Sequence, residues 1–191
     1  MTERKRNGTS LRMTSSASCL LVIDVQEKLI PAIHGGEAVL DHVAWLIRLA
    51  RELDVPVRLT EQYPRGLGPT VARVRSQVLD DELLEKVHFS CLDADPIRRE
   101  LAALGRRQVI LAGTETHVCV LQSAFQLLED GYQVFVVDEA VASRKPRDTE
   151  LGLARMRDAG AQVVSREMVA FEWLNRAGTD QFKKVSKTFI V

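Results

Sequence analysis

The sequence predicts an α/β fold, in which helices cover both faces of a mostly parallel six-stranded sheet to form a three-layer α/β/α sandwich. Two observations predict this fold. Short runs of apolar, mostly β-branched residues recur along the chain, as in strands that are buried on both faces of a parallel sheet. Segments with the 3.6-residue period of an amphipathic helix stand between these runs, and this alternation favours right-handed crossovers between parallel strands.

In the first half of the chain, each expected element has its own signal. Residues 19–25 are apolar and β-branched and predict a buried strand. Apolar residues then recur every three or four positions over 41–53, which predicts a helix. A second strand is expected over 55–60, and the loop over 60–70 contains two prolines and two glycines, so it cannot be the interior of a helix. The other elements expected here are a helix at about 71–84 and a short third strand over 86–90.

The second half continues the alternation. Asp95 is expected to cap a helix that begins at Pro96 and ends before Gly105. A fourth strand is expected over 108–112, and the apolar residues over 119–129 form one broad helix face. The remaining elements expected are a strand over 133–137, a helix over 146–159, a strand over 162–164 and a last helix over 168–175.

If the sheet is doubly wound, as in Rossmann-like folds, its strand order is 3-2-1-4-5-6, and strands one and four are neighbours. Ligands of such sheets bind at the switch point between the carboxyl ends of these two strands. Asp24 follows the first strand, and residues 113–119 follow the fourth. The sequence therefore predicts a functional site formed by these two segments.

The length of the chain predicts one domain. With 191 residues and about 150 residues per domain, a second domain is not expected. Residues 1–16 are basic and polar and lack the apolar core of a secretory signal, so we expect them to form a disordered tail. The single domain is then expected over 17–191, and both Met1 and Met13 stay open as the true start.

Charge and cysteine content narrow the classes of partner. Because 26 Lys and Arg balance 26 Asp and Glu, there is no bulk electrostatic attraction for nucleic acid or an anionic membrane. No apolar run approaches the roughly 20 residues of a membrane span. Three cysteines without CxxC spacing argue against a disulfide framework and for a reducing, cytoplasmic compartment. A small-molecule substrate is the partner that we expect.

Three residues near the predicted switch point suggest nucleophilic chemistry. Cys119 is expected in the first turn of a helix, where free N–H groups and the helix dipole favour a thiolate. Asp24 is too costly to bury as an unpaired charge, and Lys86 is a candidate for the cation that pairs with it. In this hypothesis Asp24 takes the thiol proton as a general base, Lys86 stabilises the thiolate, and Cys119 attacks a carbonyl.

The segments around these residues resemble the isochorismatase-like cysteine hydrolase superfamily. LLVIDVQEKL surrounds Asp24, EKVHFSC contains Lys86, and LAGTETHVCVLQSA contains Cys119. Together with TEQYPRGLGPT and VVDEAVASR, the pattern is most similar to the isochorismatase-domain-containing hydrolases. The resemblance spans Cys19 to about Leu174.

The resemblance implies that Asp24, Lys86 and Cys119 form a catalytic triad and that Cys119 forms a thioester during hydrolysis of an amide-like (C–N) or ester-like substrate. It also implies a non-proline cis peptide between Thr114 and Glu115. This bond is expected to aim the N–H of Glu115, with that of Cys119, at the developing oxyanion. The resemblance further implies a homo-oligomer.

The loop after the second strand departs from one subgroup of the superfamily. Nicotinamidases carry Asp-x-His and a further His that hold a metal ion, whereas this chain has Thr60, Glu61, Gln62 and Tyr63 there. We therefore expect neither a metal nor a cofactor. Gln62 and Tyr63, and His117 in the cysteine segment, are candidate substrate contacts, although Tyr63 is also consistent with simple packing in a turn.

A second hypothesis stays open at this point. The chain is also consistent with a catalytically weak binding or scaffold protein that retains the pocket, or with a redox sensor that uses only the Cys119 thiol. The sequence does not identify the substrate, because pocket contacts that distinguish related ligands differ by only about 1–3 kcal/mol each.

Overall fold

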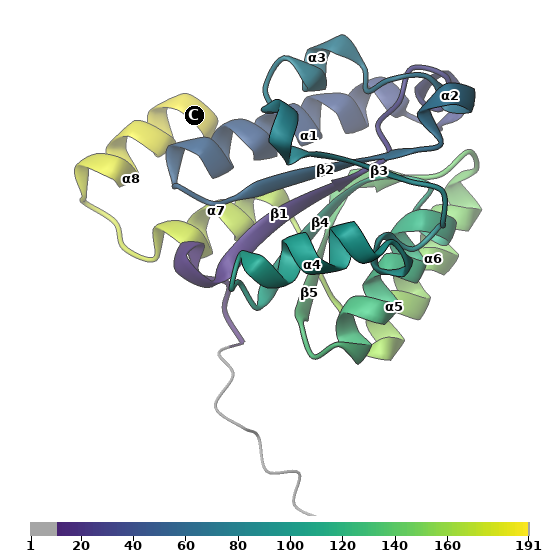
Figure 1. Cartoon of the computed structure of the whole chain (residues 1–191). Coiled ribbons are helices and arrows are strands. Elements are labelled where there is room, and N and C mark those ends of the chain that lie inside the picture. Colours follow the sequence, from purple (N-terminus) through teal and green to yellow (C-terminus); the bar gives the residue numbers. More distant parts are fainter. Residues whose placement is uncertain (1–10, 191) are drawn as a thin grey trace, which may run out of the picture.

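A six-stranded sheet lies at the centre of the computed structural model, which describes residues 11–190 (Figure 1). The strand order is β3-β2-β1-β4-β5-β6, and every neighbouring pair is parallel, which confirms the predicted fold class and order. The strands are β1 (Ser18–Ile23), β2 (Val57–Gln62), β3 (Leu83–Lys86), β4 (Gln108–Thr114), β5 (Gln133–Ala142) and β6 (Gln162–Val164).

Helices cover both faces of this sheet (Figure 1). One face carries α1 (Gly36–Glu52), α7 (Arg166–Leu174) and α8 (Asp180–Val185), and the other carries α4 (Asp95–Ala103), α5 (Leu121–Glu129) and α6 (Pro146–Ala159). Two short helices, α2 (Pro64–Leu67) and α3 (Ala72–Arg75), belong to the connection between β2 and β3. Within residues 11–190, no helix is both long enough and apolar enough to cross a membrane.

Strand β1 shows why the central strands are apolar throughout. Leu20 and Val22 belong to the core that β1 shares with α1 and α7. Cys19, Leu21 and Ile23 belong to the core on the opposite face, with α4, α5 and α6. Because successive side chains of a strand point to opposite faces, a strand between two helical layers is buried at every position. Each large aliphatic side chain buried in this way contributes roughly 1.5–3 kcal/mol.

The third strand lies earlier in the chain than predicted. The expected strand over 86–90 and the expected helix over 71–84 were both wrong, since β3 ends where the predicted strand begins and only α3 is an α-helix in that stretch. The reason is tertiary pairing: β3 continues along β2, with Lys86 opposite Gln62. Beyond that point the carbonyl groups of residues 88–89 accept hydrogen bonds from the Lys86 ammonium, so they do not extend the sheet.

The predicted tail over 1–16 is also too long. Its first ten residues, 1–10, lie outside the described residues, but the rest of it packs onto the domain. Met13 is fully buried in the core beside α7, and its N–H donates a hydrogen bond of 2.6 Å to the Glu172 carboxylate. A single methionine among polar residues has no periodicity that would reveal such packing.

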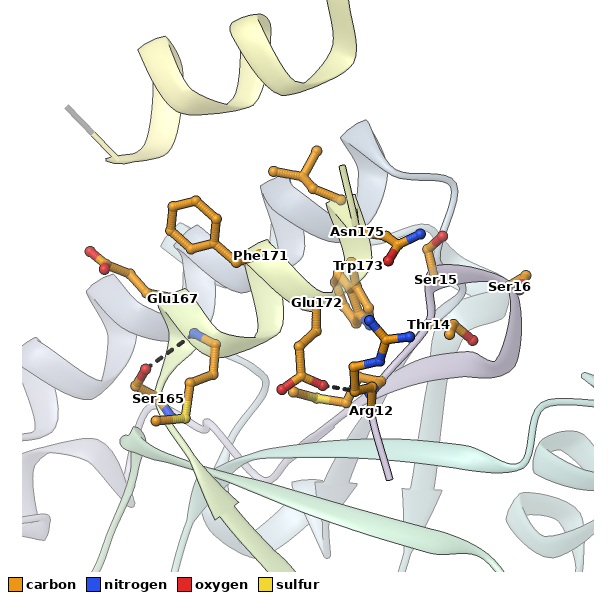
Figure 2. A pocket seen from close by; sticks show the side chains of 13 residues that line it. Arg12, Thr14, Ser15, Ser16, Ser165, Glu167, Phe171, Glu172, Trp173 and Asn175 are labelled. Carbon is orange, nitrogen blue, oxygen red and sulfur yellow. Dashed lines mark hydrogen bonds between the residues drawn. The ribbon is translucent and has the colours of Figure 1, made fainter. Parts of the chain in front are cut away.

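A pocket of about 820 Å³ lies between this N-terminal segment and α7 (Figure 2). Phe171 and Trp173 on α7 and Arg12 on the N-terminal segment line it. The pocket adjoins the segment that precedes β1, whereas the predicted site residues follow the carboxyl ends of the strands. None of the predicted site residues lines it.

Candidate active site

The carboxyl ends of β1 and β4 lie close together because Gly113 has no side chain. Ile23 pairs with Gly113, and a Cβ atom added to this glycine would lie 2.1 Å from the Ile23 carbonyl oxygen. The φ angle of Gly113 is also +125°, which other residues rarely adopt. Asp24 and Thr114, which follow Ile23 and Gly113, then make contact, since the Thr114 hydroxyl donates a hydrogen bond of 2.6 Å to the Asp24 carbonyl oxygen.

Asp24 and Lys86 form a buried ion pair at this point. The Lys86 ammonium lies 2.7 Å from Asp24 Oδ2, and both side chains are 0% exposed. The expectation that Lys86 is the partner of Asp24 is therefore confirmed. Burial alone lowers the pKa of Lys86, but the neighbouring Asp24 charge raises it, with smaller contributions from Cys91, from Cys119 and from the hydrogen bond to Asp24. The net pKa lies above that of an ordinary lysine, so the amine stays protonated.

The Lys86 ammonium has further acceptors besides Asp24. It donates a hydrogen bond of 2.7 Å to Gln62 Oε1 and longer ones, of 3.3 Å, to the carbonyl oxygens of His88 and Phe89. An ammonium has three protons, and these four acceptors use all of them. Lys86 is therefore held as a fixed positive charge beside Asp24.

Cys119 reaches the same ion pair from the other side of the switch point. After β4 the chain forms a π-helical turn, Thr116–Val120, which leads into α5. Such π-turns occur often at functional sites. The turn packs against α6 at Gly152, where an added Cβ would lie only 3.0 Å from the Thr116 carbonyl oxygen. The Cys119 side chain is buried there, close enough to Asp24 for the charge of that carboxylate to act on its thiol.

The environment of Cys119 does not favour a thiolate in the resting protein. Burial raises the pKa of the Cys119 thiol, and the negative charge of Asp24 raises it further. The positive charge of Lys86 lowers the pKa, but it does not outweigh these effects. The expectation of a thiolate favoured by the helix start is therefore wrong, because burial and the neighbouring carboxylate dominate.

The peptide bond between Thr114 and Glu115 also differs from its predicted conformation. No peptide bond among residues 11–190 is cis, so the predicted cis bond at this position is wrong. The chain turns out of β4 through backbone dihedrals instead, with Gly113 at φ +125° and Glu115 in the left-handed region at φ 59°. Without the cis bond, the argument that it aims the Glu115 N–H at an oxyanion no longer holds.

The predicted substrate contacts Gln62, the last residue of β2, and Tyr63, which follows it, have different surroundings. Gln62 is buried, and its amide lies between the Lys86 ammonium and the Val87 carbonyl oxygen. Tyr63 is 54% exposed, and its ring lies over Gly66, where a Cβ would be 2.4 Å from ring carbons. Tyr63 also lines a pocket of about 650 Å³ whose wall includes Lys86. A substrate contact by Tyr63 stays a prediction.

His117, the third predicted contact, lies on the π-turn beside Cys119. Its Nδ1 atom is 2.9 Å from the hydroxyl of Ser143, which is fully buried. Two carboxylates approach the same ring, Glu115 at 3.6 Å and Asp148 at 3.9 Å. These neighbours hold the ring beside the cysteine segment, and its contact with a substrate stays a prediction.

Thr60 is a member of this site that the sequence reasoning missed. Its hydroxyl donates a hydrogen bond of 2.7 Å to Asp24 Oδ1, and the Cys91 sulfur lies 4.0 Å from the same hydroxyl. The available signal was its place near the end of the second strand, where it pairs with the residue before Asp24. Among the residues that the structure describes, no three His, Cys, Asp or Glu side chains are grouped as a metal ion requires.

Comparisons with known proteins agree with this fold. The model of the isochorismatase domain matches residues 18–168. Isochorismatase domain-containing protein 2A of Mus musculus is 38% identical over 177 residues, which are 92% of this chain and 84% of that protein. The MAR1 ribonuclease of Caenorhabditis elegans has a similar structure, with a TM-score of 0.87, 34% identity and coverage of 94% and 93% of the two chains.

The YcaC gene product of Escherichia coli, described as an octameric hydrolase of unknown specificity, also superposes with a TM-score of 0.87. It is 25% identical, and the match covers 95% of this chain and 92% of that one. The family match includes the segments that carry Asp24, Lys86 and Cys119, and it supports a hydrolase-type fold. The chain belongs to the isochorismatase family.

Proposed function

We propose that this protein is a cysteine hydrolase that cleaves a small amide-like or ester-like substrate through a thioester on Cys119, without a metal or cofactor. One observation carries the proposal. The buried Asp24 carboxylate forms an ion pair with the Lys86 ammonium, and its charge acts on the Cys119 thiol. A base beside a nucleophile, with the base oriented by a third group, is the arrangement that nucleophilic catalysis needs.

In the first half of the proposed reaction, Asp24 takes the thiol proton while the sulfur bonds to the substrate carbonyl carbon. The electron pair of the C=O bond moves to oxygen, and the N–H of Cys119 is the proposed donor to that oxyanion. When the C–N or C–O bond breaks, the leaving amine or alcohol takes the proton from Asp24.

In the second half, water attacks the thioester and gives its proton to Asp24. The carboxylic acid product leaves as the sulfur takes that proton back, which restores the thiol. Lys86 transfers no proton in this scheme, because its raised pKa keeps the amine protonated. Its fixed charge stabilises the negative charge that develops on the sulfur.

Replacement of the nucleophile tests this proposal. Cys119→Ala is expected to lower the hydrolysis rate of an active substrate, found in a panel of small amides and esters, at least about a hundredfold. The free energy of unfolding should change by about 1 kcal/mol or less, because only one sulfur atom is removed. Cys19→Ala, a change in β1 on a buried strand position, is the matched control and should retain activity. Full activity of the Cys119→Ala protein would contradict the mechanism.

The pH dependence of thiol labelling is a second prediction. Because the pKa of Cys119 is raised, the thiol is neutral in the resting protein near pH 7. The rate of iodoacetamide labelling at Cys119, located by mass spectrometry, is expected to rise about tenfold per pH unit through pH 9 without a plateau. A plateau at or below pH 7 would show a resting thiolate and would contradict the assigned environment.

A homo-oligomer is the third expectation of this function. The E. coli relative is octameric, and we propose that this chain also assembles with copies of itself. Sedimentation at micromolar concentration is expected to give a mass several times that of the 21.4 kDa chain. A monomer under these conditions would contradict the proposal. The cytoplasmic location inferred from cysteine usage stays a prediction.

The same substrate panel separates the alternative activities. The C. elegans relative is named a ribonuclease, so single-stranded RNA belongs in the panel. RNA cleavage that depends on Cys119 would overturn the assignment of a small substrate. Oxidation of Cys119 to a sulfenic acid by peroxide, with no hydrolysis of any compound, would instead favour the redox-sensor hypothesis.

A further inference from the structure

The side-chain amide of Gln62 is fixed at both ends, by a hydrogen-bond donor at its oxygen and by an acceptor at its nitrogen. Its Oε1 atom accepts a hydrogen bond of 2.7 Å from the Lys86 ammonium, and its Nε2 atom donates one of 2.9 Å to the Val87 carbonyl oxygen. An ammonium only donates and a carbonyl oxygen only accepts, so the amide cannot flip. Gln62 is also only 9% exposed, which leaves little of it available to a substrate.

A second glutamine holds the backbone of Gln62. Gln26, which is fully buried, accepts a hydrogen bond of 2.8 Å from the Gln62 N–H and donates one of 3.0 Å to the Gln62 carbonyl oxygen. The same Gln26 amide nitrogen donates to the Gly68 carbonyl oxygen at 2.7 Å. Gln26 thus joins the segment after Asp24 to Gln62 at the end of β2, the residue that contacts Lys86.

We infer that Gln62 is a positioning residue, which holds the Lys86 ammonium beside Asp24 and thereby tunes the acidity of the Cys119 thiol. This inference rests on the proposed function and replaces the substrate contact that the sequence predicted for Gln62, because Gln62 then acts through Lys86 and does not contact the substrate. The neutral amide matters. It supplies a second short hydrogen bond to the ammonium without cancelling the positive charge that stabilises the sulfur.

Two substitutions separate positioning from substrate contact, with iodoacetamide labelling of Cys119 as the readout. Gln62→Glu adds a second carboxylate beside Lys86 and is expected to slow labelling at pH 8 about tenfold. This change corresponds to a rise of about one unit in the pKa of the Cys119 thiol. Gln62→Met removes the acceptor of the Lys86 ammonium, which is then held less firmly. It is expected to slow labelling about threefold, which corresponds to a rise of about half a unit in the thiol pKa. Each profile is measured from pH 6 to pH 10, and thermal unfolding of each variant verifies that it is folded.

The matched control is Gln108→Met, which removes another buried glutamine at the opposite, amino-terminal end of β4. It is expected to lower stability and leave the labelling profile unchanged. Wild-type labelling in both folded Gln62 variants, or an equal shift in Gln108→Met, would overturn the inference. If Gln62→Met does not fold, the nearly isosteric Gln62→Glu protein alone decides the outcome.

This experiment also keeps the inference separate from the proposed function. Labelling needs no substrate, so its result stands even if the wild-type protein hydrolyses nothing. Once a substrate is known, Gln62→Met is expected to lower kcat with little change in KM, as for an interaction made in the transition state. A rise in KM alone would show a substrate contact and would overturn the positioning role.

Discussion

Lys86→Met is expected to destabilise the protein by about 3–5 kcal/mol, because it leaves a carboxylate buried without its counter-charge. The Asp24 and Lys86 side chains are both 0% exposed, so water cannot replace the lost partner. The Thr60 hydroxyl still donates to the Asp24 carboxylate, but a neutral donor does not compensate a buried charge. Urea unfolding at pH 7.5 measures the loss, and labelling of Cys119 should slow as well, since the cation that lowers its pKa is gone.

The control for Lys86→Met is a double variant. Asp24→Asn together with Lys86→Met removes both charges, and it is expected to recover a large part of the lost stability while remaining inactive. Recovery of stability without activity separates the cost of an unpaired charge from the chemical role of the pair. A loss below about 1 kcal/mol in the single variant would contradict the buried ion pair.

Gly113→Ala is expected to lower the free energy of unfolding by at least about 4 kcal/mol and to yield little folded protein. Two effects add at this residue. Its φ angle of +125° is strained for any residue with a Cβ, and that Cβ would lie 2.1 Å from the Ile23 carbonyl oxygen and 2.5 Å from the Ile23 nitrogen. Both contacts are with backbone, so β1 and β4 must separate at the position where Asp24 and Thr114 meet.

Gly160→Ala separates the two effects in that prediction. Gly160 ends α6 at φ +109°, close to the angle of Gly113, but an added Cβ there has no atom within 4 Å. We expect Gly160→Ala to lower the free energy of unfolding by about 1–2 kcal/mol, because backbone strain alone acts there. Thermal and urea unfolding of both variants measure the difference. Equal losses would mean that the close approach of β1 to β4 is not needed.

Local patterns were sufficient to predict the strand order. Residues 19–25 and 108–112 are apolar at nearly every position, and such runs form buried parallel strands wherever helical segments stand between them. The handedness of the crossovers then leaves few arrangements, of which the doubly wound order is common. The same order predicted that Asp24 and the cysteine segment would meet, which the structure confirms.

The third strand and the N-terminal segment could not be predicted in this way. Residues 83–86 include two charged side chains and form a strand because they pair with β2. Met13 is buried because α7 and the sheet enclose it, although its neighbours in the chain are polar. In both cases the deciding contacts come from residues far away in the sequence, so a local pattern carries no sign of them.

By itself, the sequence determined the fold class and the strand order, and it predicted Asp24, Lys86 and Cys119 as the catalytic residues, because periodicity and motifs are local properties of the chain. The tertiary structure decided the protonation of Cys119, the trans peptide before Glu115 and the role of Gln62 as a partner of Lys86. These properties depend on burial, on the distance between charges and on the space around the backbone. Such quantities exist only when distant segments have been packed together.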